Sequence, residues 1–89
     1  MGGTYFVECY WPGVKAHDVA AAVERHSGEP SGQEPVALLE SILVPVDEIV
    51  LCIFEGPSAE AVGASARSCG LPAERIVDCV QLQAPGTTS

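Results

Sequence analysis

One segment, IVLCIF at residues 49–54, is apolar at every position and constrains the fold more than any other feature of the sequence. Successive side chains of a strand point to opposite faces of its sheet, so a strand covered on one face alternates between apolar and polar residues. A strand without a polar position needs cover on both faces. The chain has 89 residues, which is enough for one hydrophobic core and too few for two.

Three more strands and two helices are predicted around this segment. Residues 4–11, TYFVECYW, combine aromatic and β-branched residues and stop at a Pro-Gly turn. Residues 58–60 open the second helix, because the Ser58 hydroxyl is placed to cap backbone amides and Glu60 lies in the positive first turn. The predicted strands are residues 4–11, 36–44, 49–54 and 75–83, and the predicted helices are residues 16–26 and about 58–70.

The resulting order, βαββαβ, predicts a single α+β domain of ferredoxin-like type over residues 1–89, ordered from about 4 to 83 with a flexible tail at 84–89 and a mobile connection at 28–35. In this fold two helices cover one face of a four-stranded antiparallel sheet. The other face, with Glu8 between Phe6 and Tyr10, then needs a second cover. A second copy of the chain, forming a two-fold homodimer, is the economical candidate, and a large ligand is the alternative.

Charge and composition exclude several classes of partner. Four basic residues stand against twelve acidic ones, so phosphate backbones and anionic lipids would repel the protein. No apolar run approaches the roughly 20 residues that cross a bilayer, and no export signal precedes the first strand. The four cysteines form no CxxC pair, which favours free thiols and a cytoplasmic location.

Three segments resemble a family of small bacterial ferredoxin-like proteins described as nickel-binding-protein-like. The family pattern combines a V-E-x-Y-x-P-G turn, F-E-x-P-S-x-E-A-V, and G-x-P before a final I-V-x-x-V strand. The resemblance spans about residues 5–82. The matching positions are Val7-Glu8, Tyr10, Pro12-Gly13, Phe54-Glu55, Pro57-Ser58, Glu60-Ala61-Val62, Gly70, Pro72, Ile76-Val77 and Val80.

The resemblance implies a dimeric fold and nickel bound mostly through histidine. This chain departs from that pattern where the family's metal-binding members carry histidine, because it has Ala66, Leu71, Tyr10 and Trp11 at those places. The sequence is therefore closest to a histidine-poor branch of the family.

Glu8 is the first candidate for function, since a carboxylate between Phe6 and Tyr10 loses hydration unless it gains a partner. It is a candidate metal ligand or proton acceptor, and Tyr10 on the same face is a candidate hydrogen-bond partner of the same guest. A structural carboxylate that bonds to Tyr10, an arginine or a partner chain is the plainer interpretation. Glu40 interrupts the strand at residues 36–44 and is a further candidate ligand contact, or a solvated charge near a sheet edge.

Cysteine and histidine offer soft and borderline metal ligands. Cys9 and Cys52 lie on neighbouring predicted strands and Cys79 on the strand at the other side of the first, so thiolates gathered there would suit zinc, copper(I) or nickel. Inert core cysteines are the alternative, with Cys69 expected to be the most accessible of the four. His17 and His26 stand nine residues apart on one helix and cannot share a site. His17 is expected to be solvated and His26 to cap the helix end.

Two functions remain open from the sequence. The first is a homodimer that binds a small molecule or a divalent metal through Glu8, Tyr10, Glu40 and Cys52, with Cys9, His17 and His26 as possible metal ligands. The second is a small enzyme without a cofactor, of cyclase, isomerase or oxygenase type, in which Glu8 is the acid or base and Tyr10 assists, an inference from fold analogy alone. A structural partner of another protein is a third possibility.

Overall fold

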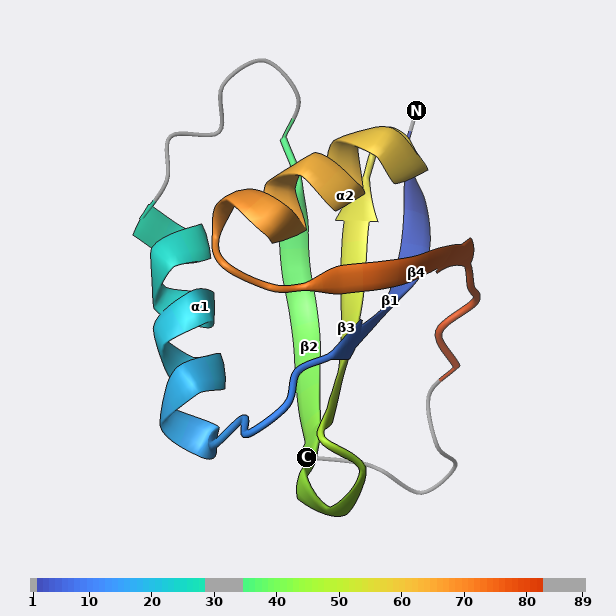
Figure 1. The fold of residues 1–89 in the computed structure, drawn as a ribbon. Helices are drawn as coiled ribbons and strands as arrows, with labels where there is room; N and C mark the ends of the chain where they lie inside the picture. Colours follow the sequence, from blue (N-terminus) through green and yellow to red (C-terminus); the bar gives the residue numbers. More distant parts are fainter. Residues whose placement is uncertain (1, 29–34, 83–89) are drawn as a thin grey trace, which may run out of the picture.

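The computed structural model describes residues 2–28 and 35–82. Within these ranges the elements follow the predicted βαββαβ order (Figure 1), which confirms the ferredoxin-like α+β fold. The strands are β1 (Gly3–Tyr10), β2 (Ala37–Val44), β3 (Ile49–Gly56) and β4 (Ala73–Asp78), the helices are α1 (Ala16–Gly28) and α2 (Ala59–Ser68), and the short 3-10 turn η1 (Pro45–Asp47) joins β2 to β3.

The sheet is antiparallel throughout and has the strand order β2-β3-β1-β4. Both helices pack on the same side of it (Figure 1). We call this side the inner face; its buried strand residues are Val7, Cys9, Val50, Cys52 and Phe54. They meet Val19 and Ala22 of α1 and Val62 and Ala66 of α2, so the core lies between one sheet face and two helices.

The outer face carries the alternate residues of the same strands, because paired residues of neighbouring strands share a face. No described helix covers it. β3 therefore divides its apolar residues as predicted, with Val50 and Cys52 buried in the core and Leu51 only half-buried outside. The outer face includes Thr4, Phe6, Glu8 and Tyr10 of β1, Ala37, Glu40, Ile42 and Val44 of β2, Ile49, Leu51, Ile53 and Glu55 of β3, and Arg75 and Val77 of β4.

Both ends of α2 are fixed by local hydrogen bonds. The Ser58 hydroxyl accepts a bond from the Ala61 amide at 3.1 Å, which confirms the predicted cap. At the other end the Leu71 amide donates to the Ala66 carbonyl at 3.0 Å and the Gly70 amide to the Arg67 carbonyl at 3.1 Å. This is a Schellman arrangement, and its left-handed position belongs to Gly70, whose φ is 99°.

β4 is shorter than predicted and begins earlier, since it covers residues 73–78 where the sequence indicated 75–83. The Cys79 amide makes a last bond to the Thr4 carbonyl at 3.0 Å, one residue from the first residue of β1. β4 ends here because β1, the strand with which it pairs, begins at Gly3. Val80 and Leu82, still in strand-like alternation, are left 82% and 84% exposed. Residue 83, the predicted tail and most of the predicted connection at 28–35 lie outside the described residues.

Neither of the two described helices is long and apolar enough to span a bilayer.

Candidate functional site

Glu8 occupies the middle of the outer face. Its direct neighbours across the sheet are Leu51 on β3 and Arg75 on β4. The Glu8 side chain is 35% exposed, and its Oε1 lies 3.8 Å from Nη1 of Arg75. A long ion pair with an exposed arginine stabilises little. The carboxylate is therefore neither buried nor firmly held, and it stands on an apolar surface with one loosely placed cation beside it.

Tyr10 and Glu40 share the outer face with Glu8 but differ in distance from it. Tyr10 is two residues along β1 and 47% exposed. Glu40 is exposed, lies two strands away and pairs with Ile53, one rung removed from the Glu8–Leu51 pair. The spacing between strands and the rise per residue place the Cα atoms of Glu8 and Glu40 about 12 Å apart. Within one chain Glu8 and Glu40 are therefore not direct neighbours, because β3 lies between their strands.

Cys52 lies on the inner face and not with Glu8, so the four predicted ligand contacts are divided between the two faces of the sheet. Cys52 and Cys9 are both fully buried there. Cys9 pairs with Val50 and Cys52 with Val7, which makes the two cysteines diagonal neighbours on adjacent strands. The predicted meeting of these two thiols in the fold is confirmed.

The two thiols ionise unequally, because each affects the pKa of the other. The contact with Cys52, then burial, then the charges of Cys52, Cys69 and Glu74 raise the pKa of Cys9 far above the usual thiol range. The contact with Cys9 lowers the pKa of Cys52, and so does its contact with the Ser41 hydroxyl, at a sulfur-to-oxygen distance of 3.9 Å. The pKa values of the two thiols therefore move apart, that of Cys52 downward and that of Cys9 upward.

Two other expectations about cysteine are wrong. Cys69, expected to be the most accessible, is fully buried at the end of α2, and its thiol donates to the Ala66 carbonyl at 3.2 Å. Cys79 was expected to join Cys9 and Cys52, but it follows β4 and bonds to Thr4, at the opposite end of β1 from Cys9. Half-exposed Cys79 is the most accessible cysteine.

The histidines hold separate positions, as predicted. His17 is exposed in the first turn of α1, with Nε2 3.4 Å from Asp18 Oδ1. His26 does not cap α1. Its Nε2 lies 3.1 Å from the Ser65 hydroxyl of α2, and its ring meets Phe54 edge-on at 5.7 Å between centroids. The helix-end side chain that was expected to face backbone carbonyls is instead a contact between the two helices and the core.

The residues predicted as metal ligands, Cys9, His17 and His26, are therefore not brought together. Across residues 2–28 and 35–82, no three side chains of histidine, cysteine, aspartate or glutamate are arranged to hold a metal ion. Nickel(II) in proteins takes four or more donors in a tetragonal or related geometry. The described part of a single chain does not fit that requirement.

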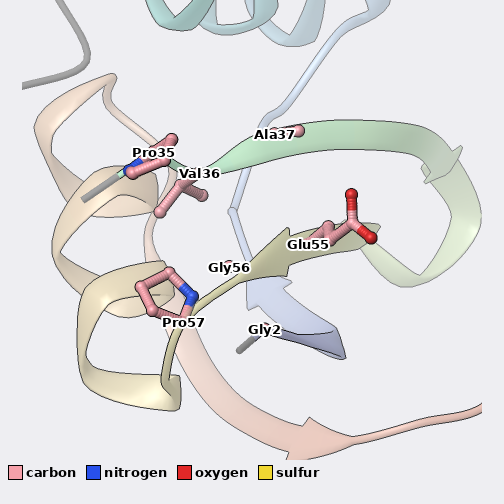
Figure 2. A pocket seen from close by; sticks show the side chains of 7 residues that line it. All are labelled: Gly2, Pro35, Val36, Ala37, Glu55, Gly56 and Pro57. Atoms are coloured by element: carbon pink, nitrogen blue, oxygen red, sulfur yellow. The ribbon is translucent and has the colours of Figure 1, made fainter.

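A hollow that the sequence did not indicate opens at the other end of the sheet (Figure 2). Its volume is about 530 Å³, and among the described residues that line it Glu55 is the only one with an ionisable side chain. Gly56 is required beside it, since a Cβ there would lie 2.9 Å from Val62 and 3.2 Å from Val36. The sequence feature at this place is the family motif F-E-x-P-S, which residues 54–58 match. The lining residues are Gly2, Pro35, Val36, Ala37, Glu55, Gly56 and Pro57.

Comparison with known proteins agrees with the geometry. The crystal structure of SCO4226 from Streptomyces coelicolor A3(2) superposes with a TM-score of 0.76 at 24% sequence identity, covering 92% of this chain and all of that one. At this identity the likeness establishes the fold alone. No curated protein matches the sequence. The family model described as nickel responsive protein SCO4226-like matches residues 5–79, most of the chain, and the protein therefore belongs to the SCO4226-like family of nickel responsive proteins.

Proposed function

We propose that the protein acts as a two-fold homodimer whose outer faces enclose a site for a small ligand or a divalent metal ion, with Glu8 as the charged contact. The observation that carries this proposal is the position of Glu8 on a surface that no described helix covers. Leu51 and Phe6 beside it are half-buried, and Ile42 on the same surface is 47% exposed. Broad apolar surfaces of this kind mark interaction sites.

A second copy supports both parts of the proposal. It would cover the outer face with an equal apolar surface, as a two-fold interface requires. It would also bring a second Glu8 and a second Tyr10 to the same space, which doubles the oxygen donors available there. Excluding water from that space would strengthen each contact that a carboxylate makes.

Nickel is the first metal to test because the family is named for its response to nickel. The donor set of one chain is insufficient, so binding is expected to depend on the dimer. In this proposal, carboxylate and phenol oxygens of both copies are the ligands, in place of the family's histidines.

The experiment uses protein without a polyhistidine tag. Native mass spectrometry, with nickel, zinc and copper(II) offered in turn, reports the number of chains and of metal ions in one measurement. We expect a dimer that takes up stoichiometric metal, and Glu8→Gln should weaken uptake by at least about tenfold, since even the loss of a residue that only supports a metal ligand costs about 10–100-fold in affinity. Glu24→Gln, at an exposed position of α1, is the matched control and should bind as the wild type does.

The outcomes separate the parts of the proposal. If the protein is a monomer at all concentrations, the proposal of a site enclosed between two copies is wrong. A dimer that binds none of the three metals would remove the metal and leave a small organic ligand, to be sought by mass spectrometry of the protein as it is purified. Equal metal uptake by Glu8→Gln and wild type would remove Glu8 from the site.

A further inference from the structure

The diagonal pair Cys9 and Cys52 lies on the face of the sheet opposite Glu8 and has no part in the proposed function. Both side chains are fully buried. They extend from diagonal positions of β1 and β3 on the same face of the sheet, and the ionisation of each depends on the other. The β1–β4 register shifts between Glu8 and Cys9, so Cys9 also sits at a bulge. Bulges redirect side chains and are frequent beside binding sites.

Backbone geometry opposes a disulfide between them. Diagonal neighbours in an antiparallel pair have Cα atoms about 7–8 Å apart. A disulfide requires a Cα separation of about 4.4–6.8 Å. Joining the sulfurs directly would pull two central strands out of register, whereas the thiol pair fits the sheet as it stands.

A metal ion between the sulfurs meets no such obstacle. Two metal–sulfur bonds of the length that zinc makes, about 2.3 Å, would span about 4.6 Å from sulfur to sulfur when the three atoms are in line. This span suits two side chains that point to the same face of the sheet from diagonal positions, so an ion fits between them without a change in strand register. Soft thiolates select soft ions such as copper(I).

We propose that Cys9 and Cys52 form a two-coordinate site for a soft monovalent cation, copper(I) or silver(I), between the sheet and the helices. Zinc(II) and nickel(II) need more ligands than this place offers, because no third cysteine, histidine or carboxylate among the described residues completes a metal group. Copper(I) and silver(I) are stable with two sulfur ligands in line.

The reaction is a ligand exchange without a redox step. Two thiols and one monovalent ion give a bis-thiolate complex of charge −1 and release up to two protons to solvent. Two sulfur–metal bonds form and the two sulfur–hydrogen bonds break. The Ser41 hydroxyl, beside Cys52, is placed to donate to the bound thiolate.

The test is an anaerobic titration of the untagged, fully reduced protein with silver(I), and with copper(I) held in acetonitrile. We expect one ion per chain by native mass spectrometry, proton release in weak buffer, and two sulfur neighbours by X-ray absorption. Cys79→Ser should leave all three unchanged. Cys9→Val and Cys52→Val, which keep the core apolar, should each weaken binding by at least about 100-fold, since a single thiol loses the effective concentration of the second.

Each remaining outcome overturns the proposal. If Cys79→Ser abolishes uptake, the ion binds at the accessible thiol and not in the core. If Cys9→Val binds as tightly as wild type, the pair is not the site. If the valine variants do not fold, which circular dichroism reports, absorption spectra of Cys79→Ser decide instead: a count other than two sulfurs contradicts the assignment. Glu8→Gln separates this site from the proposed outer-face site, because it should leave silver(I) uptake intact.

Discussion

The unequal ionisation of Cys9 and Cys52 predicts how the stability of the metal-free protein depends on pH. The pKa of a thiol in the unfolded chain is about 8.5. The folded Cys52 has a lowered pKa, so it stabilises the fold above about pH 8.5 and this contribution fades as the pH falls through its folded pKa. The folded Cys9 has a raised pKa and keeps its proton when the unfolded chain loses one. The free energy of unfolding should therefore rise to a maximum at about pH 8.5 and then fall by up to about 1.4 kcal/mol per pH unit.

Urea denaturation between pH 6.5 and 10.5, under reducing conditions, measures this profile. Cys9→Val is the comparison, because it removes the contact that lowers the pKa of Cys52 and leaves burial, which raises that pKa, so the rise in stability below about pH 8.5 should disappear. A wild-type profile that keeps rising to pH 10.5 would contradict the assignment of the retained proton to Cys9.

At the scale of single residues, the sequence predicted which side chains share a face of one strand but not which side chains meet between elements. The alternation of β1 placed Glu8 beside Phe6 and Tyr10 correctly, since alternation depends only on the strand. The partner Arg75 was not identified, because it is set by the register between β1 and β4. His26 was assigned to its own helix end for the same reason: its contacts, Ser65 and Phe54, come from elements distant in sequence.

The cap of α2 gives a prediction at the scale of one element. Ser58→Ala removes the acceptor for the Ala61 amide and should lower the free energy of unfolding by about 1 kcal/mol, within a range of about 0.5–2 kcal/mol. Ser58→Asp, which retains an acceptor oxygen, should cost much less. Chemical denaturation of the three proteins measures both effects, and equal loss from alanine and aspartate would show that the hydroxyl does not act as a cap.

Helices and strands were predictable to different degrees for a physical reason. The limits of α2 depend on local signals, Ser58 before it and Gly70 after it, and both hold in the structure. The limit of β4 depends on another strand. The pattern of apolar residues continues to Leu82, but pairing stops near Thr4 because β1 begins at Gly3. The hollow at Gly56 was missed because backbone and small residues line most of it.

For the whole molecule, the proposed dimer predicts the effect of one charge on the outer face. Ile42→Glu places a carboxylate on that apolar surface and should shift the protein to monomer, as measured by sedimentation velocity over a range of concentrations. Val46→Glu is the control, because Val46 is exposed in η1, outside the outer face. A dimer that tolerates Ile42→Glu and not Val46→Glu would place the interface elsewhere.

The strand order has a consequence for how the molecule is made. β1 precedes both of its neighbours in the sequence yet lies inside the sheet, since β3 and β4 begin at Ile49 and Ala73. Until the ribosome has added Ile49 and the residues after it, both edges of β1 are unpaired. Closing such distant pairs slows folding, and exposed strand edges attract other chains. The second edge of β1 therefore stays unpaired until β4 has been synthesised and has joined the sheet.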